Sequence, residues 1–519
     1  MSYVIGVDIG TQGSKGVLLD ESLNVTAMVY AEQNYIQPKP GWFEHDAEKT
    51  WWGGFKTILN LLLEKTSISP SEIAGVGCST ISPCMLPTDE NGKPLRNAIL
   101  YGIDTRSKEE VEEVLRQLGE ETTHEAGKVP SLGTDNPVPK LLWLKKNEPE
   151  IFLKTRKIFQ GTSYITYKLT GRFLLDFKQA GLWFYPIYNQ EHKEWDTEMC
   201  KMLGFSPDLL PDLMNCYDIA GTVTPEASAE TGLRQGTPVV LGAADGLAEL
   251  ISAGGFSQGD VTLIYGSTGI VSLSTGILTD QKIENGAFHL MLENRSSIGG
   301  ATATTGSLTK WFRDNFGDVE KIIQDRTGVN AYSLLSRQAE NIPPGSEGLI
   351  VLPYFSGERA PIFDSSARGV IFGLTMHHTR AHLYRALLEG TAYSFCHILE
   401  NFEKYKVKIS QVIACGGGAQ SSLWVKIVSD VIGHDQTILS IPTGSDIGSA
   451  YLAAKGIGLI DDIASFLLDR RQENARIVKA DMQNHSRYQE LYHIYRNLYE
   501  HTKGEMWTLS KLMEASTEQ

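Results

Sequence analysis

Three short runs of apolar residues, separated by polar turns, occupy the first thirty positions of the chain. The runs are VIGVDI (4–9), KGVLLD (15–20) and NVTAMVY (24–30), and the segment between the first two is GTQGS (10–14). Short apolar runs around turns rich in glycine and polar side chains are typical of neighbouring strands. The pattern therefore predicts an antiparallel meander of three strands at the start of the chain.

A helix and a further strand are predicted next. Between Asp46 and Lys65 the apolar residues recur at helical spacing, and Asp46 can cap the N-terminus of that helix. The short apolar run IAGVGCS (73–79) indicates a buried strand. This half of the chain is therefore expected to mix strands and helices.

The same pattern returns halfway along the chain. Residues 260–276 again form an apolar run, a turn of Gly, Ser and Thr, and a second apolar run, and a strand followed by a helix is predicted over 237–255. We interpret this as an internal duplication, with a first domain at 1–236 and a second at 237–519. Two similar lobes with a cleft between them are the simplest architecture. The tail at 488–503 predicts an amphipathic terminal helix whose role is packing.

Length and charge limit the class of function. A chain of 519 residues is longer than one hydrophobic core usually organises, which agrees with two domains, and its apolar share of 41% suffices for two cores. The 47 basic and 62 acidic residues give a formal charge of −15. Nucleic acids and anionic membranes require a basic surface, so neither is expected as the main partner, and any phosphate site must be local.

Cysteine usage and hydropathy indicate the compartment. The six cysteines are scattered without a C-x-x-C pair, which is typical of reduced thiols and not of a zinc or redox motif. No apolar stretch approaches the about 18 residues that span a bilayer, and the first residues lack the basic and apolar regions of a leader. We therefore expect a soluble cytoplasmic protein.

Three turns of glycine and hydroxyl residues are candidates for nucleotide binding. The G-x-x-x-x-G-K-[ST] pattern is absent, and no G-x-G-x-x-G follows the first strand. The turns are Gly10–Lys15, Gly266–Gly269 and Ala414–Trp424, the last of which opens a predicted helix. Backbone N–H groups of such turns can face phosphates, but each turn by itself also fits a simple tight turn.

Asp8 lies at the mouth of the first turn. A carboxylate beside phosphates is repulsive unless a cation lies between them, and Mg²⁺ prefers one or two carboxylates together with water and phosphate oxygens. Asp8 therefore suggests a Mg²⁺–ATP site, with the phosphates facing Thr11, Gln12, Gly13 and Lys15. The alternative is that Asp8 only caps the hairpin turn.

Asp245 is the second acid of interest, because it follows a predicted buried strand at the point where a helix starts. It can be a helix N-cap. It can also be a general base that faces a crevice and takes the proton of a substrate hydroxyl as that oxygen attacks phosphorus. The local sequence leaves both interpretations open.

Six segments in order resemble the FGGY family of carbohydrate kinases. In the first half they are DIGTQGSKGVLLD, PGWFEHDAEKTWW and NPVPKLLWLKKNEPEIF, and in the second half GLIVLPYFSGERAP, RGVIFGLTMHHTRAHLYRALLEG and IACGGGAQSSLWVKIVSDVIG. The resemblance covers essentially the whole chain. It implies an α/β protein with the two-lobed actin-like ATPase (ribonuclease H-like) fold, duplicated domains and a central cleft. It also implies transfer of the ATP γ-phosphoryl group to a sugar hydroxyl, with ATP and Mg²⁺ as cofactors.

The resemblance also implies roles for individual residues. Asp245 is the expected catalytic base, and Asp8 is the expected metal ligand. The first phosphate turn would contain Asp8, Gly10, Thr11, Gln12, Gly13 and Lys15. The second would contain Gly266, Ser267 and Thr268, and the adenosine would lie against Gly416, Gly417, Gly418 and Ala419. Closing of the lobes would bring ATP and sugar together and exclude water.

Within the family, the segments are most similar to xylulokinases, which implies conversion of D-xylulose to D-xylulose 5-phosphate. The segment STISPCMLP (79–87) departs from the xylulokinase pattern, since it lacks the usual histidine. Another ketose, a polyol or a sugar acid such as gluconate therefore stays open as the substrate. The expected substrate-binding residues are Thr80, Ser82, Trp42, Asp104, Arg106 and Asp245. Trp42 also fits a core position, and Asp104 and Arg106 also fit an ion pair on a loop.

Two other functions fit the same fold. A catalytically silent, ATP-dependent sugar sensor is one, and the presence of Asp245 argues against it. A chaperone-like ATPase is the other, and no peptide-binding domain follows. A homodimer would agree with the resemblance.

Overall fold

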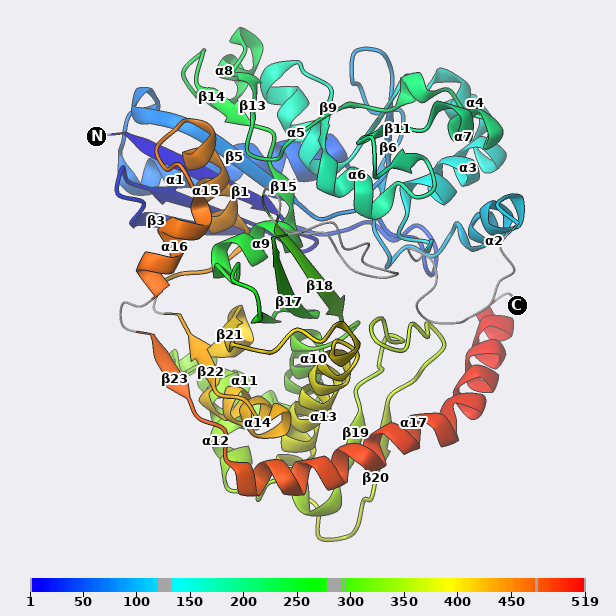
Figure 1. The fold of residues 1–519 in the computed structure, drawn as a ribbon, viewed down its shortest axis with the longest axis vertical. Coiled ribbons are helices and arrows are strands. Elements are labelled where there is room, and N and C mark those ends of the chain that lie inside the picture. The colour runs from blue at the N-terminus through cyan, green and yellow to red at the C-terminus, as the bar shows by residue number, and fades with distance from the viewer. Residues whose placement is uncertain are drawn as a thin grey trace. The chain divides into compact units, whose positions relative to one another are not determined.

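The computed structural model describes residues 2–119, 132–277, 292, 295–439, 441–471 and 475–517. Over these residues the chain divides into two compact units (Figure 1). The first contains Met1–Gly254 and Pro442–Arg470, and the second contains Gly255–Gln281, Leu292–Ile441 and Arg471–Gln519. Each unit is built around one mixed sheet.

The sheet of the first unit begins with the predicted meander. Strands β1 (Tyr3–Ile9), β2 (Gly13–Leu19) and β3 (Val25–Glu32) are antiparallel, and β5 (Ile73–Thr80) pairs in parallel with β1. Beyond β5 lie β14 (Pro238–Val240) and β13 (Ile219–Thr222), and β15 (Ala243–Ala244) also pairs with β5. The sheet order is β13-β14-β5-β1-β2-β3.

The predicted helix after Asp46 is present as two joined pieces. The Asp46 carboxylate accepts the backbone N–H groups of Glu48 and Lys49 and so caps the π-helix η1 (Ala47–Trp52), which continues into α1 (Gly53–Thr66). Trp51 and Phe55 of these helices are buried in the core against the sheet. The N-cap prediction for Asp46 is confirmed.

The remaining elements of the first unit surround its sheet or form a second core. The strands are β4 (Glu44–His45), β6 (Leu86–Thr88), β7 (Ala98–Ile99), β8 (Lys157–Phe159), β9 (Leu174–Asp176), β10 (Tyr188–Asn189), β11 (Glu194–Trp195) and β12 (Asp212–Met214). The helices are η2 (Pro70–Glu72), α2 (Lys108–Gln117), α3 (Pro137–Asn147), α4 (Pro149–Lys154), α5 (Gly161–Thr170), α6 (Phe177–Trp183), α7 (Thr197–Met202), η3 (Pro207–Leu209), α8 (Pro225–Thr231), α9 (Asp245–Ala253), α15 (Ser445–Gly456) and α16 (Ile463–Arg471). The second core packs around Trp143 of α3.

The second unit repeats the arrangement. Strands β16 (Asp260–Tyr265), β17 (Gly269–Ile277) and β18 (Arg295–Ala301) form an antiparallel meander, and β21 (Gln411–Cys415) pairs in parallel with β16. β22 (Gln436–Ile438) and β23 (Arg476–Val478) complete the sheet, in the order β18-β17-β16-β21-β22-β23. Its other elements are α10 (Gly306–Phe316), α11 (Asp318–Thr327), α12 (Ala331–Glu340), η4 (Ser346–Gly348), β19 (Ile350–Leu352), β20 (Val370–Phe372), α13 (Arg380–Glu400), η5 (Glu403–Tyr405), η6 (Gly417–Gln420), α14 (Ser422–Ile432) and α17 (Met482–Thr517).

The two sheets have the same plan. In each, a three-strand antiparallel meander is followed by two parallel strands and an antiparallel edge strand. This equivalence agrees with the internal duplication expected from the sequence. The expected break at residue 236 falls inside the first unit, because β14 and β15 pair with β5 and keep the chain in that unit as far as Gly254.

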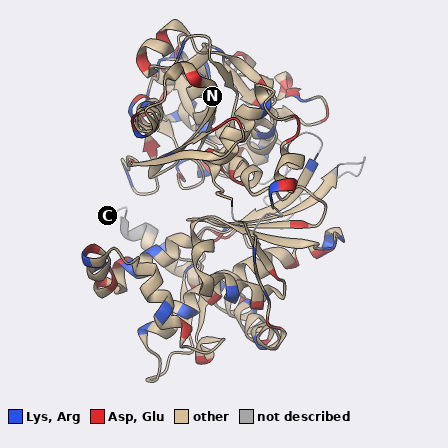
Figure 2. Ribbon diagram, turned by 90° about the vertical axis from the view of Figure 1, so that its left-hand side faces the viewer, with Lys and Arg blue, Asp and Glu red and all other residues tan. Residues whose placement is uncertain are grey.

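The tail forms the predicted amphipathic helix. In α17 the buried face includes Tyr488, Tyr492, Tyr495 and Tyr499, and the Tyr495 hydroxyl lies 2.8 Å from that of Tyr354. All six cysteines are free thiols, and no helix of the described part of the chain could cross a membrane. Basic and acidic residues are interspersed over both units (Figure 2).

Candidate active site

Three parallel strands of the first unit end at the same edge of the sheet. In the register of these strands, Asp8 of β1 lies beside Ser79 of β5, and Ala244 of β15 lies beside Thr80. Asp245 directly follows Ala244 and is the first residue of α9. Ligands of α/β folds commonly bind beyond the carboxyl ends of such strands, so Asp8 and Asp245 lie where a reaction centre is expected.

The local alternatives for these two acids are not what the structure shows. Asp8 accepts a hydrogen bond from the Ser79 hydroxyl at 2.8 Å, and among the described residues it accepts none from the N–H groups of its hairpin turn. Ala244, not Asp245, occupies the N-cap position of α9. Among the residues that the structure describes, the one hydrogen bond to the Asp245 carboxylate comes from the adjacent Gly246 N–H, at 2.8 Å. Neither carboxylate is therefore used as a cap.

Helix α15 brings a further acid to this edge because it packs unusually close to the sheet. A Cβ on Gly6 of β1 would lie 2.0 Å from the carbonyl oxygen of Asp446, and one on Gly77 of β5 would lie 2.1 Å from that of Ser449. A Cβ on Gly448 would lie 1.8 Å from the carbonyl oxygen of Ala248 in α9. Glycine at these positions lets α15 lie against the sheet and α9, with Asp446 in its first turn.

Four carboxylates and one lysine share this region. Lys15 of β2 lies 4.0 Å from Asp8, measured between Nζ and Oδ2. Burial acts to lower the pKa of Lys15, but the negative charges of Asp8, Glu249, Asp446 and Asp245 outweigh it and raise that pKa. Negative charge therefore dominates the centre.

The pKa values of the acids respond to the same crowding. Burial and then the charge of Asp8 raise the pKa of Asp245 well above its usual range. Burial raises the pKa of Glu249 to about 7, although Lys15 opposes the rise, and burial and Asp8 raise that of Asp446 to about 6. Perturbed carboxyl groups of this kind are common at catalytic centres.

The donor set fits a magnesium ion. The Oδ2 atom of Asp446 is buried and has no hydrogen-bond partner among the described residues, and Asp8 lies at the same edge, where it binds Ser79 and lies 4.0 Å from Lys15. A small cation that prefers carboxylate and water oxygens would satisfy this orphaned oxygen and offset the excess negative charge.

Side chains hold the carbonyl groups of the first turn. Gln33 donates from Nε2 to the Gly10 carbonyl. The buried His45 lies 3.2 Å, through Nε2, from the Thr11 carbonyl, and its Nδ1 accepts the Trp51 indole N–H at 3.1 Å. The Trp51 bond occupies the Nδ1 lone pair and leaves the proton on Nε2, so His45 donates to Thr11. Burial lowers the pKa of His45 to about 4, which keeps the ring neutral.

The second and third turns lie at the carboxyl ends of neighbouring strands in the second unit. Gly266, Ser267 and Thr268 follow β16, and Gly416 to Ala419 follow β21, which pairs with β16. The Gly266 carbonyl accepts the Gly306 N–H at 2.8 Å, and the Ser267 carbonyl accepts the Thr305 N–H at 3.0 Å. In this turn too, carbonyls are held from one side, here by the start of α10. The sheet therefore brings the second and third turns together.

The third turn packs closely on the end of β16. Gly416 has a positive φ of 86°, and a Cβ on Gly418 would lie 2.6 Å from the Trp424 ring and 2.9 Å from Cβ of Tyr265. Such contacts leave no room for a side chain at Gly418, whereas Gly417 beside it is exposed and has nothing within 4 Å of a Cβ position.

Two of the expected substrate-binding residues have partners within the protein. Thr80 is fully buried, and its hydroxyl lies 3.0 Å from that of Thr162. The partly buried Ser82 donates to Oε1 of Gln179 at 3.1 Å. Close to Ser82, Gln160 accepts the Cys84 N–H at 2.7 Å, and its buried Nε2 has no partner among the described residues.

Three more of the expected substrate-binding residues, Trp42, Asp104 and Arg106, form one structural network. The Arg106 guanidinium has no exposed surface, and it binds Asp104 through Nε and Nη2 (2.7 Å at Nη2) and Glu44 through Nη1 at 2.9 Å. Its centre lies 4.2 Å from the Trp42 ring, on which it stacks. The ion-pair alternative is thus what the structure shows for Asp104 and Arg106, while the Trp42 side chain stays partly exposed.

Sequence reasoning missed several residues of this centre. Glu249 and Asp446 bring additional negative charge, and Gln33 and His45 hold the first turn. The segment TGSDIGSA (443–450) carried a signal for Asp446, namely an acid between small residues at the start of a helix. Glu249 also carried one, since it lies four residues after Asp245 on the same face of a predicted helix. Gln33 and His45 had none, because the carbonyls that they bind are distant in the sequence.

The chain is similar to known proteins over nearly its whole length. Residues 3–252 match the N-terminal domain of the FGGY family of carbohydrate kinases, and residues 263–457 match its C-terminal domain. A xylulose kinase of Bacillus subtilis is 30% identical over 504 residues, which cover 97% of this chain and 98% of that protein. A gluconokinase of the same organism is 28% identical over 464 residues, covering 89% and 88%.

A solved structure shows the same fold. The crystal structure of xylulose kinase from Rhodospirillum rubrum superposes with a TM-score of 0.79 at 28% identity, covering 97% of this chain and 99% of that one. The match to both family domains, the shared actin-like fold and the near-complete coverage thus all indicate the same family. The chain therefore belongs to the FGGY family of carbohydrate kinases and is an ATP-dependent sugar phosphotransferase.

Proposed function

We propose that the protein phosphorylates D-xylulose to D-xylulose 5-phosphate, with Asp245 as the general base. The observation that carries the proposal is the position of Asp245 beyond β15, beside the strand ends that hold Asp8 and Thr80. The substrate is supported by the similarity to xylulose kinases over nearly the whole chain.

Asp245 suits proton removal from a sugar hydroxyl. Its Oδ1 accepts the Gly246 N–H, and within the part of the chain that the structure describes its Oδ2 has no hydrogen bond, so this oxygen can accept the hydroxyl proton. The raised pKa brings its basicity closer to that of a base that works near neutral pH. The sugar oxygen then attacks the γ-phosphorus of ATP, the bond to the β–γ bridging oxygen breaks, and ADP leaves.

The phosphates are assigned to the turns. Backbone N–H groups of Thr11 to Gly13, with the Lys15 ammonium, would neutralise charge in a largely dissociative transition state. Asp8 and Asp446 would hold Mg²⁺, which supplies electrostatic stabilisation of the phosphate oxygens. Gly266 to Thr268 and Gly416 to Ala419 would hold the remaining phosphates and the adenosine, as the resemblance implies.

The sugar end is assigned to Ser82 and Trp42. The hydroxyl of Ser82 and the buried Nε2 of Gln160 offer polar groups near the end of β5. Asp104 and Arg106 act indirectly, because their ion pair holds the ring of Trp42. Thr80 contributes to the wall through its bond to Thr162 and does not reach the substrate.

The test is ADP release by the purified full-length protein with ATP and Mg²⁺. The acceptor panel contains D-xylulose, D-ribulose, D-fructose, glycerol, erythritol and D-gluconate. We expect the highest kcat/KM with D-xylulose. An Asp245→Asn variant keeps the oxygen that accepts the Gly246 N–H, and we expect it to lower kcat by about 10²–10⁴-fold.

The control is Asp196→Asn, which alters an N-cap carboxylate of α7 that lies outside this centre. It should keep the activity. If another acceptor is turned over and Asp245→Asn loses that activity, the proposed mechanism is supported and that acceptor replaces D-xylulose as the substrate. ATP binding without sugar-stimulated turnover of any compound would contradict the kinase mechanism and favour a sugar sensor.

A sugar acid such as D-gluconate is the second candidate. Lys140 of α3 is fully buried, donates to the Asp135 carbonyl at 2.9 Å, and has its pKa lowered by burial to about 8. Burial raises the pKa of the Cys84 thiol to about 12, and the charges of both Lys140 and Asp245 also act on it. A substrate carboxylate needs a cation such as Lys140. A kcat/KM for D-gluconate above that for D-xylulose would favour this candidate.

A further inference from the structure

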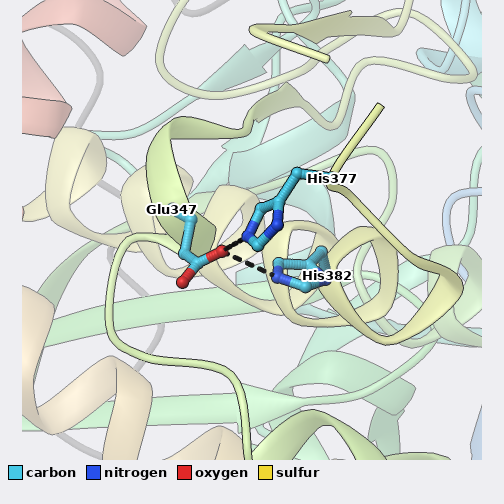
Figure 3. Close-up of side chains that lie close together, drawn as sticks. All are labelled: Glu347, His377 and His382. Carbon is cyan, nitrogen blue, oxygen red and sulfur yellow. Dashed lines mark hydrogen bonds and ion pairs between the residues drawn. The ribbon is translucent and has the colours of Figure 1, made fainter. Parts of the chain in front are cut away.

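Two histidines and a glutamate of the second unit converge on one point that the phosphoryl-transfer chemistry does not use. Glu347 lies in η4, His377 lies in the loop before α13, and His382 lies in the first turn of α13. Both imidazoles point at the same carboxylate oxygen of Glu347, and the possible ligand atoms all lie within 4.8 Å of one another (Figure 3). Nε2 of His382 is 3.2 Å from that oxygen, and Nε2 of His377 also contacts it.

The turn that carries Glu347 is fixed independently of the histidines. The Gly345 N–H and the Ser346 hydroxyl donate to the two carboxylate oxygens of the buried Glu389 in α13, at 2.9 and 2.7 Å. Arg385 in turn binds Glu389 at 2.8 Å. The carboxylate of Glu347 is therefore placed beside α13 by buried contacts beneath it, which is the preorganisation that a ligand-binding site needs.

The hydroxyl group of Thr379 can set the tautomer of His382. Its Nδ1 lies 2.8 Å from Oγ1 of Thr379 and accepts the Thr379 N–H at 3.1 Å. With that N–H bond, Nε2 carries the ring proton and donates to Glu347. When the proton moves to Nδ1 and is donated to the Thr379 hydroxyl, the lone pair of Nε2 faces Glu347 and His377. Metal-bound histidines typically donate their second ring nitrogen in this way.

The ligand chemistry indicates the class of cation. Two imidazole nitrogens and one carboxylate suit Zn²⁺ and its neighbours in the first transition row, whereas Mg²⁺ prefers oxygen ligands throughout. The His377 side chain is 67% exposed and that of Glu347 is 36% exposed, so an ion can enter from solvent and keep water in its open positions.

We propose that Glu347, His377 and His382 form a binding site for a divalent transition-metal ion, with Zn²⁺ as the best-fitting cation. The site is separate from the Mg²⁺ that accompanies ATP, and it does not depend on which sugar is the substrate. A bound ion links η4 to the first turn of α13 and thereby stabilises the second unit.

The test is metal titration of the full-length protein after removal of metals with a chelator. Co²⁺ is followed by its visible absorption and Zn²⁺ by calorimetry. We expect one equivalent of Co²⁺ with an absorption band typical of a low-coordinate site, displaced by Zn²⁺. His377→Ala and Glu347→Gln change exposed side chains, so they should fold normally and lose this saturable binding.

Matched controls separate this site from unspecific binding to surface histidines. His192→Ala and His501→Ala remove exposed histidines elsewhere and should bind one equivalent as before. Binding that survives in His377→Ala and Glu347→Gln, or no saturable binding by the unaltered protein, would overturn the proposal.

Two further readouts address His382 and the structural role. Thr379→Val removes the hydroxyl that receives the Nδ1 proton, and we expect a loss of affinity of about 10–100-fold, with Thr379→Ser close to the unaltered protein. Zn²⁺ should raise the Tm of the unaltered protein and not that of His377→Ala. Equal affinity in Thr379→Val, or an equal rise in Tm in His377→Ala, would contradict the assigned ligands.

Discussion

At the residue scale, the first turn shows how side chains prepare a backbone for an anion. Gln33 and His45 bind the carbonyls of Gly10 and Thr11 from one side. With these carbonyls occupied, the N–H groups of Thr11 and Gln12 can face phosphate oxygens, while that of Gly10 donates to the Gly13 carbonyl at 2.9 Å. His45 can do this at any pH at which the protein works, because burial lowers its pKa to about 4.

This role of His45 predicts a selective effect on ATP. His45→Leu removes a donor to the Thr11 carbonyl, and loss of one buried hydrogen bond is worth about 1–3 kcal/mol. We expect KM for ATP to rise about 5-fold or more, with KM for the sugar unchanged, while His45→Gln retains a donor and stays closer to the unaltered enzyme. Steady-state kinetics with each substrate varied in turn provide the measurement. An equal rise in both KM values would indicate a general structural defect instead.

At the element scale, the close packing of α15 decides where the acids of the centre lie. Its contacts with β1, β5 and α9 pass through Gly6, Gly77 and Gly448, whose missing side chains allow backbone to meet backbone. A helix held at an ordinary distance would move Asp446 away from Asp8. The geometry of the centre is therefore set by glycines that take no part in its chemistry.

Gly448→Ala tests this statement. Its Cβ would lie 1.8 Å from the Ala248 carbonyl oxygen, so α15 or α9 must shift. Overpacking of this kind lowers the free energy of unfolding by about 1–3 kcal/mol, and we expect kcat to fall with it. Gly504→Ala is the matched control, since nothing lies within 4 Å of that position in α17 and alanine favours a helix. Thermal unfolding and kcat of both variants give the comparison, and equal behaviour would contradict the argument.

At the scale of the whole molecule, buried acids and histidines set the pH dependence of stability. Burial raises the pKa of Glu249 to about 7, of Asp446 to about 6 and of Glu358 to about 8, so the folded state keeps protons that the unfolded state has lost. Stability therefore falls as pH rises from about 4.5 to about 8 through these groups. His45 acts in the opposite sense, because its lowered pKa removes stability as pH falls below 6.5.

Because three acids act against one histidine, their slope is the larger, and Tm should rise as pH falls from about 8 to about 4.5, measured without nucleotide or divalent cations. Glu358→Gln isolates one contribution. Glu358 is buried, and its Oε1 accepts the N–H groups of Ala303 and Arg359 at 2.6 and 2.8 Å, which glutamine can still do. The variant should gain stability relative to the unaltered protein by up to about 1.4 kcal/mol for each pH unit between 4.5 and 8. A constant difference in Tm across that range would contradict the assigned pKa.

Much of the fold could be predicted from the sequence because it depends on local patterns. The two meanders, the helix capped by Asp46 and the aromatic face of α17 follow from runs of apolar residues and from one capping side chain. The three glycine turns were also recognisable. The internal duplication was visible in outline, since both halves repeat the same strand and turn pattern, although the extent of each compact unit was not.

The candidate site could be predicted only in part. The sequence identified Asp8, Asp245 and the three turns, because each has an unusual residue at a strand end or in a turn. It could not decide whether Asp8 and Asp245 serve as caps of their turn and helix. In the structure neither does, and both carboxylates lie at the strand ends. Nor could the sequence decide between an ion pair and a substrate contact for Asp104 and Arg106, because that depends on Glu44, some sixty residues away.

The elements, the duplication and the family could be recognised without a structure, since they are carried by residues close together along the chain. The folded chain was needed to show that Asp446 and Glu249 lie with Asp8, and that His45 and Gln33 hold the first turn. It also placed Glu347 against two histidines of another segment. The physical reason is the same in each case: the pKa values, hydrogen bonds and ligand geometry depend on distances in space between residues that are far apart in the sequence.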